Sequence, residues 1–540
     1  MSMSGASCDI LVIGGGHNGL VCACYLARAG LRVRVLERRP LVGGAAVTEE
    51  FHPGFRNSVA SYTVSLLHPK VMRDLRLAEQ GLRIVARPYA NFLPLPDGRA
   101  LRLGGGLAES CREVARFSAR DAERLPAYYA TLERVAEVLR TLLLETPPHL
   151  GGGLFEALRA VRIGRRLGRL DLAGRRDALD LLTKSAGHWL DGWFESEPLK
   201  GALGFDAVVG NFASVYASGS AYVLLHHCLG ALDGRPGQWG HAIGGMGAIT
   251  QAMARTAASL GVDILTEAPV ARILTRAGRA VGAVLADGRE FQARAVVSNL
   301  NPRLTFLELL EPGELDPDFV RRIQNWRCAS GSFRINLALA ELPDFRAAPG
   351  MAVQDHHRSG ILLAPSLDYL ERAYWDARTQ GWAREPVIEM LLPSTVDASL
   401  APPGRHVASL FCQHFNPQLP DGGDWDAVKE QVADQIIATV GRYAPNFEAA
   451  VLGRQILSPL DLERTFGLTG GDIFHGALSL DQLYSARPVL GHADYRTPVA
   501  GLYLCGSGTH PGGGVSGIPG HNAAREILRD WRRRKRRGSW

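Results

Sequence analysis

The sequence predicts an α/β protein with a dinucleotide-binding, Rossmann-like domain and a second domain of mixed α+β structure. The chain opens on a strand, a glycine-rich turn and a helix, "DILVIGGGHNGLVCACYLARAG". A second glycine-rich segment, "GLYLCGSGTHPGGGVSGIPG", follows a strand pattern close to the other end. With 540 residues, the chain is long enough for two or three domains and a large core.

The first element is a strand–turn–helix unit. An apolar run over residues 10–13 predicts the strand, and Gly14, Gly16 and Gly19 fit the spacing G-x-G-x-x-G. In this motif the first glycine allows the tight turn, the second lets a pyrophosphate approach the backbone, and the third permits close helix–strand packing. The helix N-terminus directs N–H groups and partial positive charge at the phosphates. This unit therefore predicts dinucleotide binding.

The next residues favour FAD over nicotinamide cofactors. Glu37 ends the second strand, where a carboxylate accepts hydrogen bonds from ribose hydroxyls. It would repel the 2′-phosphate of NADP, an effect that Arg38 and Arg39 soften. The Gly43-Gly44 pair in "RRPLVGGAAVTEE" is typical of flavoproteins, where the chain passes along the FAD pyrophosphate and ribityl. A plain two-glycine turn is the alternative.

The middle of the chain alternates between helical and strand patterns. Short strands are expected over residues 76–118, followed by a long amphipathic helix, "RDAERLPAYYATLERVAEVLRTLLLE". The stretch from 154 to 194 reads as helical and basic. From Gly244 a turn, a helix and a strand are expected, and then a three-stranded meander that turns at Ala277-Gly278 and Asp287-Gly288.

The closing segment gives independent support for FAD. A strand runs into Gly506, Ser507 and Gly508, and residues 515–519 are predicted to begin a helix with Pro519 in its first turn. A helix N-terminus under an isoalloxazine stabilises negative charge on the reduced flavin. The predicted nucleotide domain is thus discontinuous. We expect FAD-binding parts at 1–75, 240–305 and 495–530, substrate or cap parts at 76–239 and 306–494, and a basic tail at 531–540.

Both glycine-rich segments resemble the signatures of the phytoene dehydrogenase (carotenoid/retinoid oxidoreductase) family. Within it, "GGDIFHGALSLDQLYSARP", residues 470–488, resembles one particular branch. The resemblance covers essentially the whole chain and implies an FAD-binding Rossmann-like domain of the amine oxidase and glutathione reductase type. One departure is Ala45, because the amine oxidase form of the double-glycine motif usually continues with arginine.

The resemblance also implies which residues contact FAD. The first turn and the acid would hold the ADP half, the double glycine would follow the pyrophosphate and ribityl, one meander residue would pair with adenine, and the closing segment would lie beside the flavin. These residues are Gly14, Gly15, Gly16, Asn18, Gly19, Glu37, Arg38, Gly43, Gly44, Ala45, Val270, Gly506, Ser507, Ser516, Gly517 and Ile518.

The expected function is that of an FAD-dependent oxidoreductase of desaturase or saturase type, acting on a hydrophobic, isoprenoid or lipid-like substrate by hydride transfer at flavin N5. No second strand–GxGxxG–helix unit is visible, so oxygen, a quinone or a protein is the expected electron acceptor. The sequence singles out no catalytic acid or base. His475, His510 and His521 are the candidates. His226 and His227 lie in an apolar helical run and are expected in the core or a pocket wall, and Tyr62 lines the flavin or the core.

Composition excludes several classes of partner. A net charge of +6 without aromatic and basic interleaving argues against a nucleic-acid partner. The eight cysteines form no C-x-x-C pair, so we expect no metal site, no redox disulfide and a reducing compartment, the cytoplasm or, in a eukaryote, the mitochondrial matrix. No secretory signal and no membrane span is predicted.

The basic stretch 159–176 is open to two interpretations. Its arginines and interspersed apolar residues suit a peripheral contact with an anionic membrane, through which a lipid-like substrate would be drawn. The alternative is a solvated face or a contact between the chains of a homo-oligomer. The tail 532–537 is either a plain basic end or a further anionic-surface contact.

Two other functions remain open from the sequence. An amine or amino-acid oxidase would often use a lysine–water bridge to the flavin, yet no lysine occurs between Lys200 and Lys429. A flavoprotein that mainly binds a partner protein is the other alternative.

Overall fold

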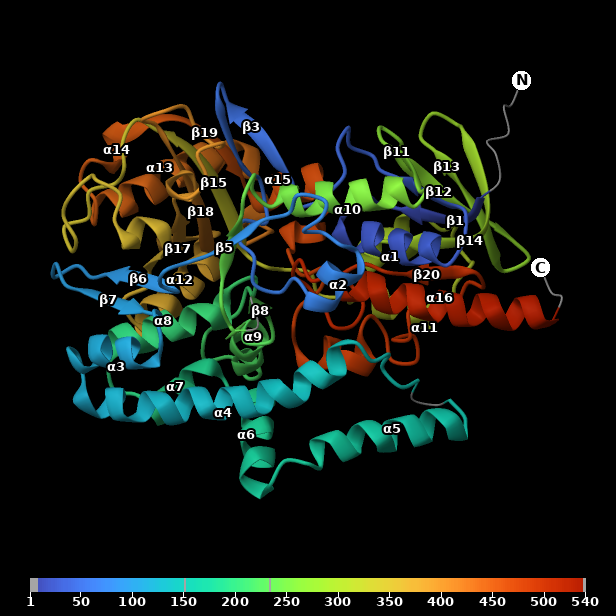
Figure 1. Ribbon diagram of the computed structural model, residues 1–540, viewed down its shortest axis with the longest axis horizontal. Helices are drawn as coiled ribbons and strands as arrows, with labels where there is room; N and C mark the ends of the chain where they lie inside the picture. Colours follow the sequence, from blue (N-terminus) through green and yellow to red (C-terminus); the bar gives the residue numbers. More distant parts are fainter. Residues whose placement is uncertain (1–7, 150–151, 233–234, 538–540) are drawn as a thin grey trace.

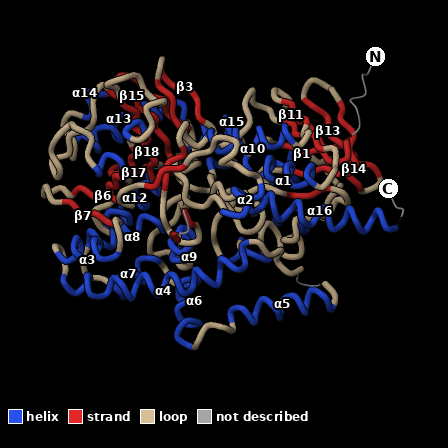
Figure 2. The backbone as a smooth tube through the Cα atoms, in the orientation of Figure 1, coloured by secondary structure: helices blue, strands red, loops and turns tan. Residues whose placement is uncertain are grey.

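The computed structural model describes residues 8–149, 152–232 and 235–537. Two sheets form the cores of two lobes that lie side by side, with a layer of helices below them (Figure 1). Most strands gather in these two places, and helices and loops surround them (Figure 2). The first described strand, β1, and the last described helix, α16, both lie in the lobe drawn on the right of Figure 1.

The first sheet lies in that lobe. It consists of β1 (Cys8–Ile13), β2 (Val33–Leu36), β11 (Asp263–Leu265), β12 (Val270–Arg276), β13 (Arg279–Leu285), β14 (Glu290–Ser298) and β20 (Leu502–Leu504). The order is β11-β2-β1-β14-β13-β12, with β20 also paired to β14. β11, β2, β1, β14 and β20 pair in parallel, whereas β13 and β12 form an antiparallel meander.

Both faces of the parallel part are buried. Ile10 and Val12 of β1 face one apolar core, and Leu11 and Ile13 face another. This arrangement is expected where helices or a second layer cover a parallel sheet on each side. The predicted strand–turn–helix unit and the three-stranded meander are both present.

Three helices pack together on this lobe: α1 (His17–Arg28), α10 (Gly247–Ser259) and α16 (Ile518–Arg537). α16 approaches α1 closely, since a Cβ at Gly520 would lie 2.1 Å from the Asn18 carbonyl oxygen. The helix begins at Ile518, three residues after the predicted start at Val515. The reason is local: Gly517 has φ +73°, which a right-handed helix excludes, and the Ser516 hydroxyl accepts the Ile518 N–H.

The second lobe contains a mixed sheet. Its strands are β6 (Asn91–Pro94), β7 (Ala100–Leu103), β15 (Ser332–Leu339), β16 (Gly360–Leu363), β17 (Trp382–Leu391), β18 (His406–Phe415) and β19 (Val451–Leu457). The order is β19-β15-β18-β17-β16-β6-β7, antiparallel except for the β16–β6 pair. Side chains alternate between two cores: Val387 and Phe411 face one side, and Ile388 and Leu410 face the other. The first side packs on α8 (Glu197–Val208) and α12 (Leu367–Gln380), and the second on α13 (Trp425–Gly441).

The helical layer includes the predicted long helix and the predicted helical stretch 154–194. One of its helices, Leu107–Ala115, lies within residues 76–118, where only short strands were expected; it buries Ser110, Glu113 and Val114, which helical spacing places on one face. The layer contains α3 (Leu107–Ala115), α4 (Ala119–Leu143), α5 (Leu154–Leu167), α6 (Leu172–Thr183), α7 (Ala186–Trp193) and α9 (Ser220–His227). Side-chain caps fix several N-termini: Ser118, Asp171 and Ser185 accept backbone N–H groups of α4, α6 and α7.

Short elements connect these parts. The strands are β3 (Thr48–His52), β4 (Phe55–Ser58), β5 (Ile84–Ala86), β8 (Ala231–Leu232), β9 (Arg235–Pro236) and β10 (Gly240–Ala242). The helices are α2 (Pro69–Asp74), α11 (Pro317–Gln324), α14 (Phe447–Ala450), α15 (Pro459–Phe466), one π-helical turn at Leu304–Glu308 and 3₁₀ turns at Asp355–Arg358, Pro393–Thr395, Pro420–Gly422, Thr469–Gly471, Leu480–Gln482 and Tyr484–Ala486. The division into FAD-binding and substrate domains stays a prediction.

Candidate functional site

A cavity of about 380 Å³ opens where β1 and β2 end and reaches β18 of the second lobe. Proteins with open parallel sheets bind their ligands at the carboxyl ends of the strands, which is where this cavity lies. Many of the predicted cofactor residues line it, namely Gly14, Gly16, Asn18, Glu37, Arg38, Gly43, Gly44, Ala45, Val270 and Ser507. His475 also lines the cavity. The predicted residues Gly15, Gly19, Gly506, Ser516, Gly517, Ile518 and His510 do not line it.

The turn between β1 and α1 forms one wall of the cavity. Gly14 has φ +92°, and a Cβ at Gly16 would lie 2.7 Å from the Asn299 side-chain nitrogen. Gly19 faces inward, because its Cβ would lie 2.3 Å from the Gly14 carbonyl oxygen. α1 then begins at His17. The turn therefore presents bare backbone and a helix N-terminus to the cavity, as phosphate binding requires.

The carboxylate of Glu37 is fixed in place beside this turn. Its two oxygens accept the backbone N–H groups of Gly15 at 2.8 Å and Arg39 at 2.9 Å. The Gly43 N–H donates to the Gly15 carbonyl at 2.9 Å, which joins the double-glycine loop to the first turn. Each carboxylate oxygen keeps a lone pair for a further donor such as a ribose hydroxyl. We call this part of the cavity, lined by Gly14, Gly16, Glu37, Gly43 and Val270, the glycine end.

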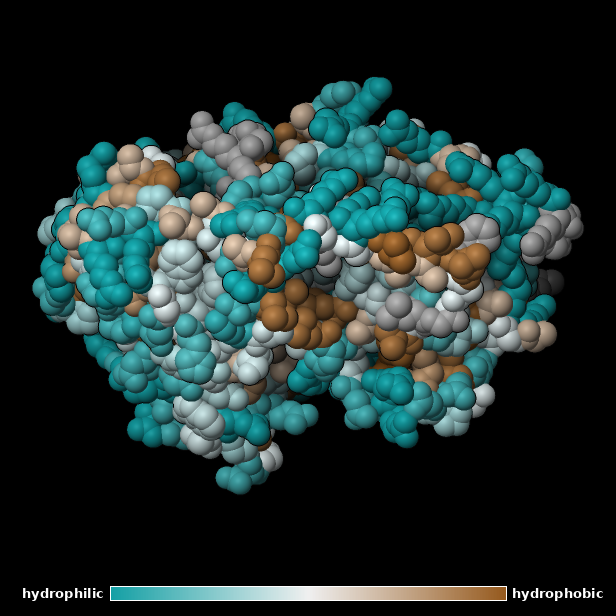
Figure 3. All heavy atoms as spheres, turned by 90° about the horizontal axis from the view of Figure 1, so that it is seen from below, coloured by the Kyte–Doolittle hydropathy of each residue, from teal (hydrophilic) through white to brown (hydrophobic). Residues whose placement is uncertain are grey.

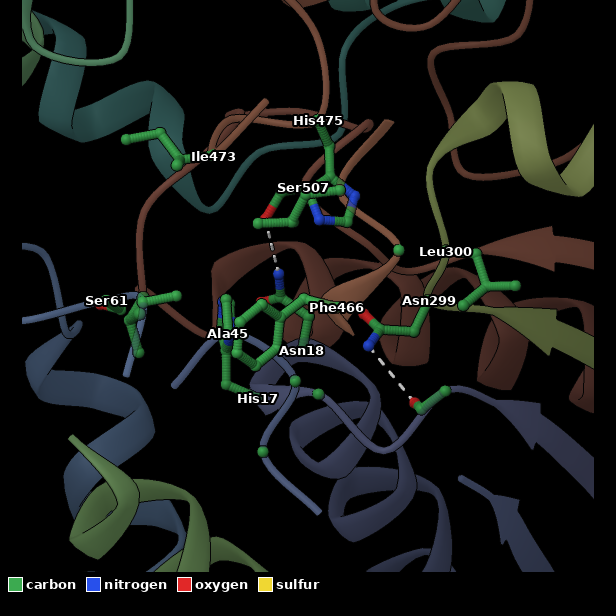
Figure 4. A pocket seen from close by; sticks show the side chains of 18 of the residues that line it. His17, Asn18, Ala45, Ser61, Asn299, Leu300, Phe466, Ile473, His475 and Ser507 are labelled. Atoms are coloured by element: carbon green, nitrogen blue, oxygen red, sulfur yellow. Dashed lines mark hydrogen bonds between the residues drawn. The ribbon is translucent and has the colours of Figure 1, made fainter. Parts of the chain in front are cut away.

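The centre of the cavity joins distant parts of the chain. The Asn18 side-chain nitrogen donates to the Ser507 hydroxyl at 3.1 Å, and the Asn299 side-chain nitrogen donates to the Gly14 carbonyl at 3.3 Å (Figure 4). His475 points toward this region from the opposite wall (Figure 4). Asn299 was not predicted from the sequence, where its only signal is its position directly after β14.

The residues present fit FAD. In the described part of the chain, buried polar atoms of five lining side chains have no hydrogen-bond partner: His17 Nε2, Asn18 Oδ1, Arg39 Nη1, His475 Nδ1 and both ring nitrogens of His227. Leaving such an atom unpaired costs about 1–3 kcal/mol, so native sites normally pair them with a ligand or water. Together with the glycine cradle and the positioned acid, these atoms suit a long ligand with phosphates and polar ring atoms.

A rigid loop presents His475. The Asp472 carboxylate accepts the N–H groups of Phe474 at 2.8 Å and Gly476 at 3.0 Å, and the Trp326 indole donates to the His475 carbonyl at 3.0 Å. His475 has φ +58°, a conformation that costs non-glycine residues about 1–2 kcal/mol and that occurs often at functional sites. Burial lowers the pKa of His475 to about 3, so its ring is neutral at physiological pH.

His510 lies behind the cavity wall. One of its ring nitrogens is 3.0 Å from the Leu142 carbonyl oxygen, and its ring meets the Tyr484 ring edge-on at 5.0 Å. Burial lowers the pKa of His510 to about 4. These contacts connect the closing segment to the end of α4.

Acid should destabilise the apo protein through the histidines in and behind this wall. Burial lowers the pKa of each of them to about 3 or 4: His17, His226, His227, His475 and His510. An unfolded histidine has a pKa of about 6.5 and takes up a proton below that pH, whereas the folded one stays neutral. The free energy of unfolding therefore decreases as the pH is lowered. When the pH is lowered from 7.5 to 5.5, each of these histidines should reduce the free energy of unfolding by about 1.4 kcal/mol. Urea unfolding at both pH values checks this; equal stability would contradict it.

The opposite part of the cavity is mostly apolar. Tyr62, Val209, Phe411 and Ile473 line it, together with Trp239 and His227. The Tyr62 ring stacks on Phe411 at 5.1 Å. We call this part the apolar end. In Figure 4 Ile473 and Ser61 lie on one side of the central residues, and Asn299 and Leu300 lie on the other.

A buried polar cluster supports the apolar end. The Tyr62 hydroxyl donates to Glu389 at 2.5 Å, and Arg87 pairs with the same carboxylate at 3.0 Å. Burial and the Glu389 charge hold the pKa of Tyr62 well above its usual range, so the phenol stays protonated. Burial and the same charge raise the pKa of Asp206 to about 7. Glu389 and Arg87 were not predicted from the sequence, because no local motif marks them.

Comparisons with known proteins agree with an FAD-binding fold. The family described as "Flavin containing amine oxidoreductase" matches residues 19–348. Pyridine nucleotide-disulfide oxidoreductase domain-containing protein 2 of Rattus norvegicus is 45% identical, over 97% of this chain and 93% of the rat protein. One of the subunits of limonene dehydrogenase from Castellaniella defragrans is 28% identical, over 97% and 95%. A lycopene-forming phytoene desaturase of Pantoea ananas is 26% identical, over 94% and 96%.

Solved structures show the same fold at low identity. Putrescine oxidase bound to putrescine superimposes with a TM-score of 0.60 at 17% identity, over 98% of this chain and 100% of the oxidase. The predicted resemblance to the phytoene dehydrogenase family, the FAD-binding fold and the FAD cofactor are thereby confirmed.

Proposed function

Because the chain belongs to the flavin containing amine oxidoreductase family and is an FAD-dependent oxidoreductase, we propose that it forms or saturates carbon–carbon double bonds in a hydrophobic, isoprenoid or lipid-like substrate. The observation that carries the proposal is the apolar end of the cavity, where aromatic and aliphatic side chains surround one face of the site. Two relatives bear the names limonene dehydrogenase and phytoene desaturase, both of which refer to isoprenoid substrates.

The proposed roles divide between the two ends of the cavity. FAD, when bound, accepts or donates a hydride at N5. At the glycine end, Gly14, Gly16, Glu37 and Gly43 would hold the ADP and pyrophosphate, and Val270 would lie near the adenine. At the apolar end, the lining side chains hold the substrate's C–H bond in position and exclude water.

An amine substrate has less support. None of the described residues that line the cavity is a lysine. At the apolar end the buried carboxylate of Glu389 is already neutralised by Arg87 and accepts a hydrogen bond from the Tyr62 hydroxyl. A cationic amine would instead meet the buried Arg334 guanidinium, 4.7 Å from the centre of the Tyr62 ring, and Asp206, whose pKa of about 7 leaves its carboxyl only partly ionised. In the desaturating direction, oxygen, a quinone or a protein acceptor reoxidises the flavin; in the saturating direction, a quinol or a reduced protein supplies the two electrons.

Product analysis tests the proposal. Purified holoenzyme is incubated with isoprenoid alcohols, isoprenoid hydrocarbons, fatty acyl lipids and amines, either with oxygen or a soluble quinone as electron acceptor or anaerobically after its flavin has been reduced with dithionite. We expect mass spectrometry to find loss of two hydrogens from an isoprenoid or lipid under the first condition, or gain of two hydrogens under the second. Turnover confined to amines, with release of peroxide and aldehyde, would contradict the proposal.

We also propose that α5 rests on an anionic membrane surface. Three of its apolar side chains are largely exposed, Leu154 at 75%, Leu158 at 57% and Val161 at 53%. Arg162 and Arg165 lie exposed beside them. Figure 3 shows hydrophobic patches bordered by hydrophilic residues on this lower face of the molecule. No helix among the described residues is long and apolar enough to cross a bilayer.

Vesicle binding should depend on these side chains. In co-sedimentation with vesicles that contain phosphatidylserine, Leu158→Glu with Val161→Glu should weaken binding at least tenfold, since each change removes apolar burial and adds repulsion. Trp375→Glu, at a residue that is 54% exposed on α12, is the control and should not change binding. Equal binding of all three proteins would contradict the contact. Loss of a dimer in the double variant would favour an interface between copies of the chain instead.

A further inference from the structure

His227 is an unpartnered polar side chain in the apolar end. It is the last residue of α9, lines the cavity and is only 6% exposed. Neither of its ring nitrogens has a hydrogen-bond partner within the described residues. Its ring lies nearly parallel to that of Trp239, with centroids 5.8 Å apart. The imidazole edge is thus left without a partner in a wall that is mostly apolar.

Burying the unpaired nitrogens of such a side chain against a pure hydrocarbon costs free energy. Burial lowers the pKa of His227 to about 3, so the ring is neutral and carries one N–H donor and one acceptor. A hydrocarbon that fills the cavity would expel water and satisfy neither nitrogen. An unpaired buried polar group of this kind costs about 1–3 kcal/mol. A ligand oxygen near the ring would remove that cost.

The neighbouring groups favour a neutral oxygen over a cationic group. Tyr62 directs its proton to Glu389, which leaves the phenol oxygen as an acceptor. Arg87 neutralises Glu389 and also donates to the Thr63 hydroxyl at 2.6 Å, with its guanidinium 5.3 Å from the Trp239 ring. The guanidinium of Arg334, which is 1% exposed, lies 4.7 Å from the centre of the Tyr62 ring and adds a positive charge here. A hydroxyl or carbonyl satisfies His227 without bringing a further positive charge into this cluster.

We propose that the apolar end contains an oxygen subsite, in which His227 hydrogen-bonds a hydroxyl or carbonyl group of an otherwise apolar substrate. The proposal rests on the proposed function in one respect, since it takes the apolar end as the place of the substrate. It narrows the substrate class from isoprenoid or lipid-like molecules in general to oxygenated ones. Tyr62 supplies a second acceptor for a hydroxyl proton.

Binding of matched ligands tests the subsite. Dissociation constants of an isoprenoid alcohol and of the hydrocarbon with the same skeleton are measured on the holoenzyme by calorimetry in one detergent. The ratio of the two constants, compared between wild type and His227→Phe, cancels the different partition of the ligands from water. We expect His227→Phe to reduce the preference for the alcohol about tenfold, as loss of one hydrogen bond to a neutral partner predicts.

Two further variants separate recognition from packing. His226 is the preceding residue of α9, is equally buried and does not line the cavity, so His226→Phe should keep the wild-type ratio. His227→Gln retains a donor and an acceptor and should keep most of the preference. An unchanged ratio in His227→Phe would overturn the subsite, and an equal loss in His226→Phe would assign the effect to packing of α9 and overturn it too.

The experiment remains decisive if one variant fails. Where His227→Phe yields no flavin-loaded protein, His227→Leu takes its place with the same expected ratio. Because the readout is ligand binding, it is independent of turnover. Selective binding of the alcohol without any redox product would support the subsite and contradict the proposed function. Turnover of hydrocarbons, with the binding ratio unchanged in His227→Phe, would support the proposed function and contradict the subsite.

Discussion

Gly16→Val is expected to purify without flavin. Gly16 has φ −68°, so the backbone tolerates a side chain, but a Cβ there would lie 2.7 Å from the Asn299 side-chain nitrogen and 3.9 Å from the Gly44 Cα. The valine methyl groups would occupy the cradle between the first turn and the double-glycine loop, where the pyrophosphate would lie. We expect at least a 100-fold loss of FAD affinity, about 2.7 kcal/mol.

Flavin absorbance per chain after gel filtration, followed by titration of the apo protein with FAD, measures this loss. Gly164→Ala is the matched control, because Gly164 lies in α5, does not line the cavity, and an added Cβ there would meet no atom within 4 Å. It should retain one FAD per chain. A yellow Gly16→Val protein with wild-type affinity would place the cofactor elsewhere.

Glu389→Gln should strongly destabilise the protein. Glu389 and Arg87 form a 3.0 Å ion pair whose side chains are 1% and 6% exposed. Removing one partner of a buried pair leaves the other charge uncompensated, which typically costs about 3–5 kcal/mol. We expect a loss of about 3 kcal/mol in the free energy of unfolding, because the glutamine still accepts one hydrogen bond.

Glu385→Gln, on the same strand, is the control. Glu385 pairs with Arg442 at 2.5 Å, but both side chains are about half exposed. Exposed pairs contribute about 0–1 kcal/mol because solvent screens them. Urea unfolding followed by tryptophan fluorescence compares the two variants. Similar small effects would show that the Arg87–Glu389 pair contributes little to stability.

The glycine end was predictable because its chemistry is local in sequence. The turn at Gly14, the helix that follows and the acid at Glu37 lie within one strand–helix–strand unit, and their spacing alone determines their relative positions. The double glycine is only a few residues further on. Each of these residues except those that pack inward, such as Gly19, lines the cavity.

The rest of the site depends on contacts between distant segments. Asn299 meets the first turn across 285 residues, and Glu389 meets Tyr62 across 327 residues. No sequence spacing marks such pairs. The closing segment shows a related limit. Of the cofactor residues predicted in this segment, only Ser507 lines the cavity. Gly506 instead packs against the end of β14, where an added Cβ would lie 2.5 Å from the Asn299 carbonyl oxygen. A glycine-rich pattern does not distinguish a ligand contact from a tight packing contact.

Anaerobic flavin spectroscopy tests the proposed activity most directly. Holoenzyme is mixed under nitrogen with an isoprenoid or lipid panel, with NADPH and with putrescine, and the visible flavin band is followed; dithionite-reduced holoenzyme is mixed with unsaturated members of the panel. We expect an isoprenoid or lipid to bleach the oxidised flavin or to reoxidise the reduced one, and NADPH and putrescine to leave the oxidised band unchanged. Bleaching by NADPH or putrescine, with no response to any isoprenoid or lipid, would contradict the proposed function.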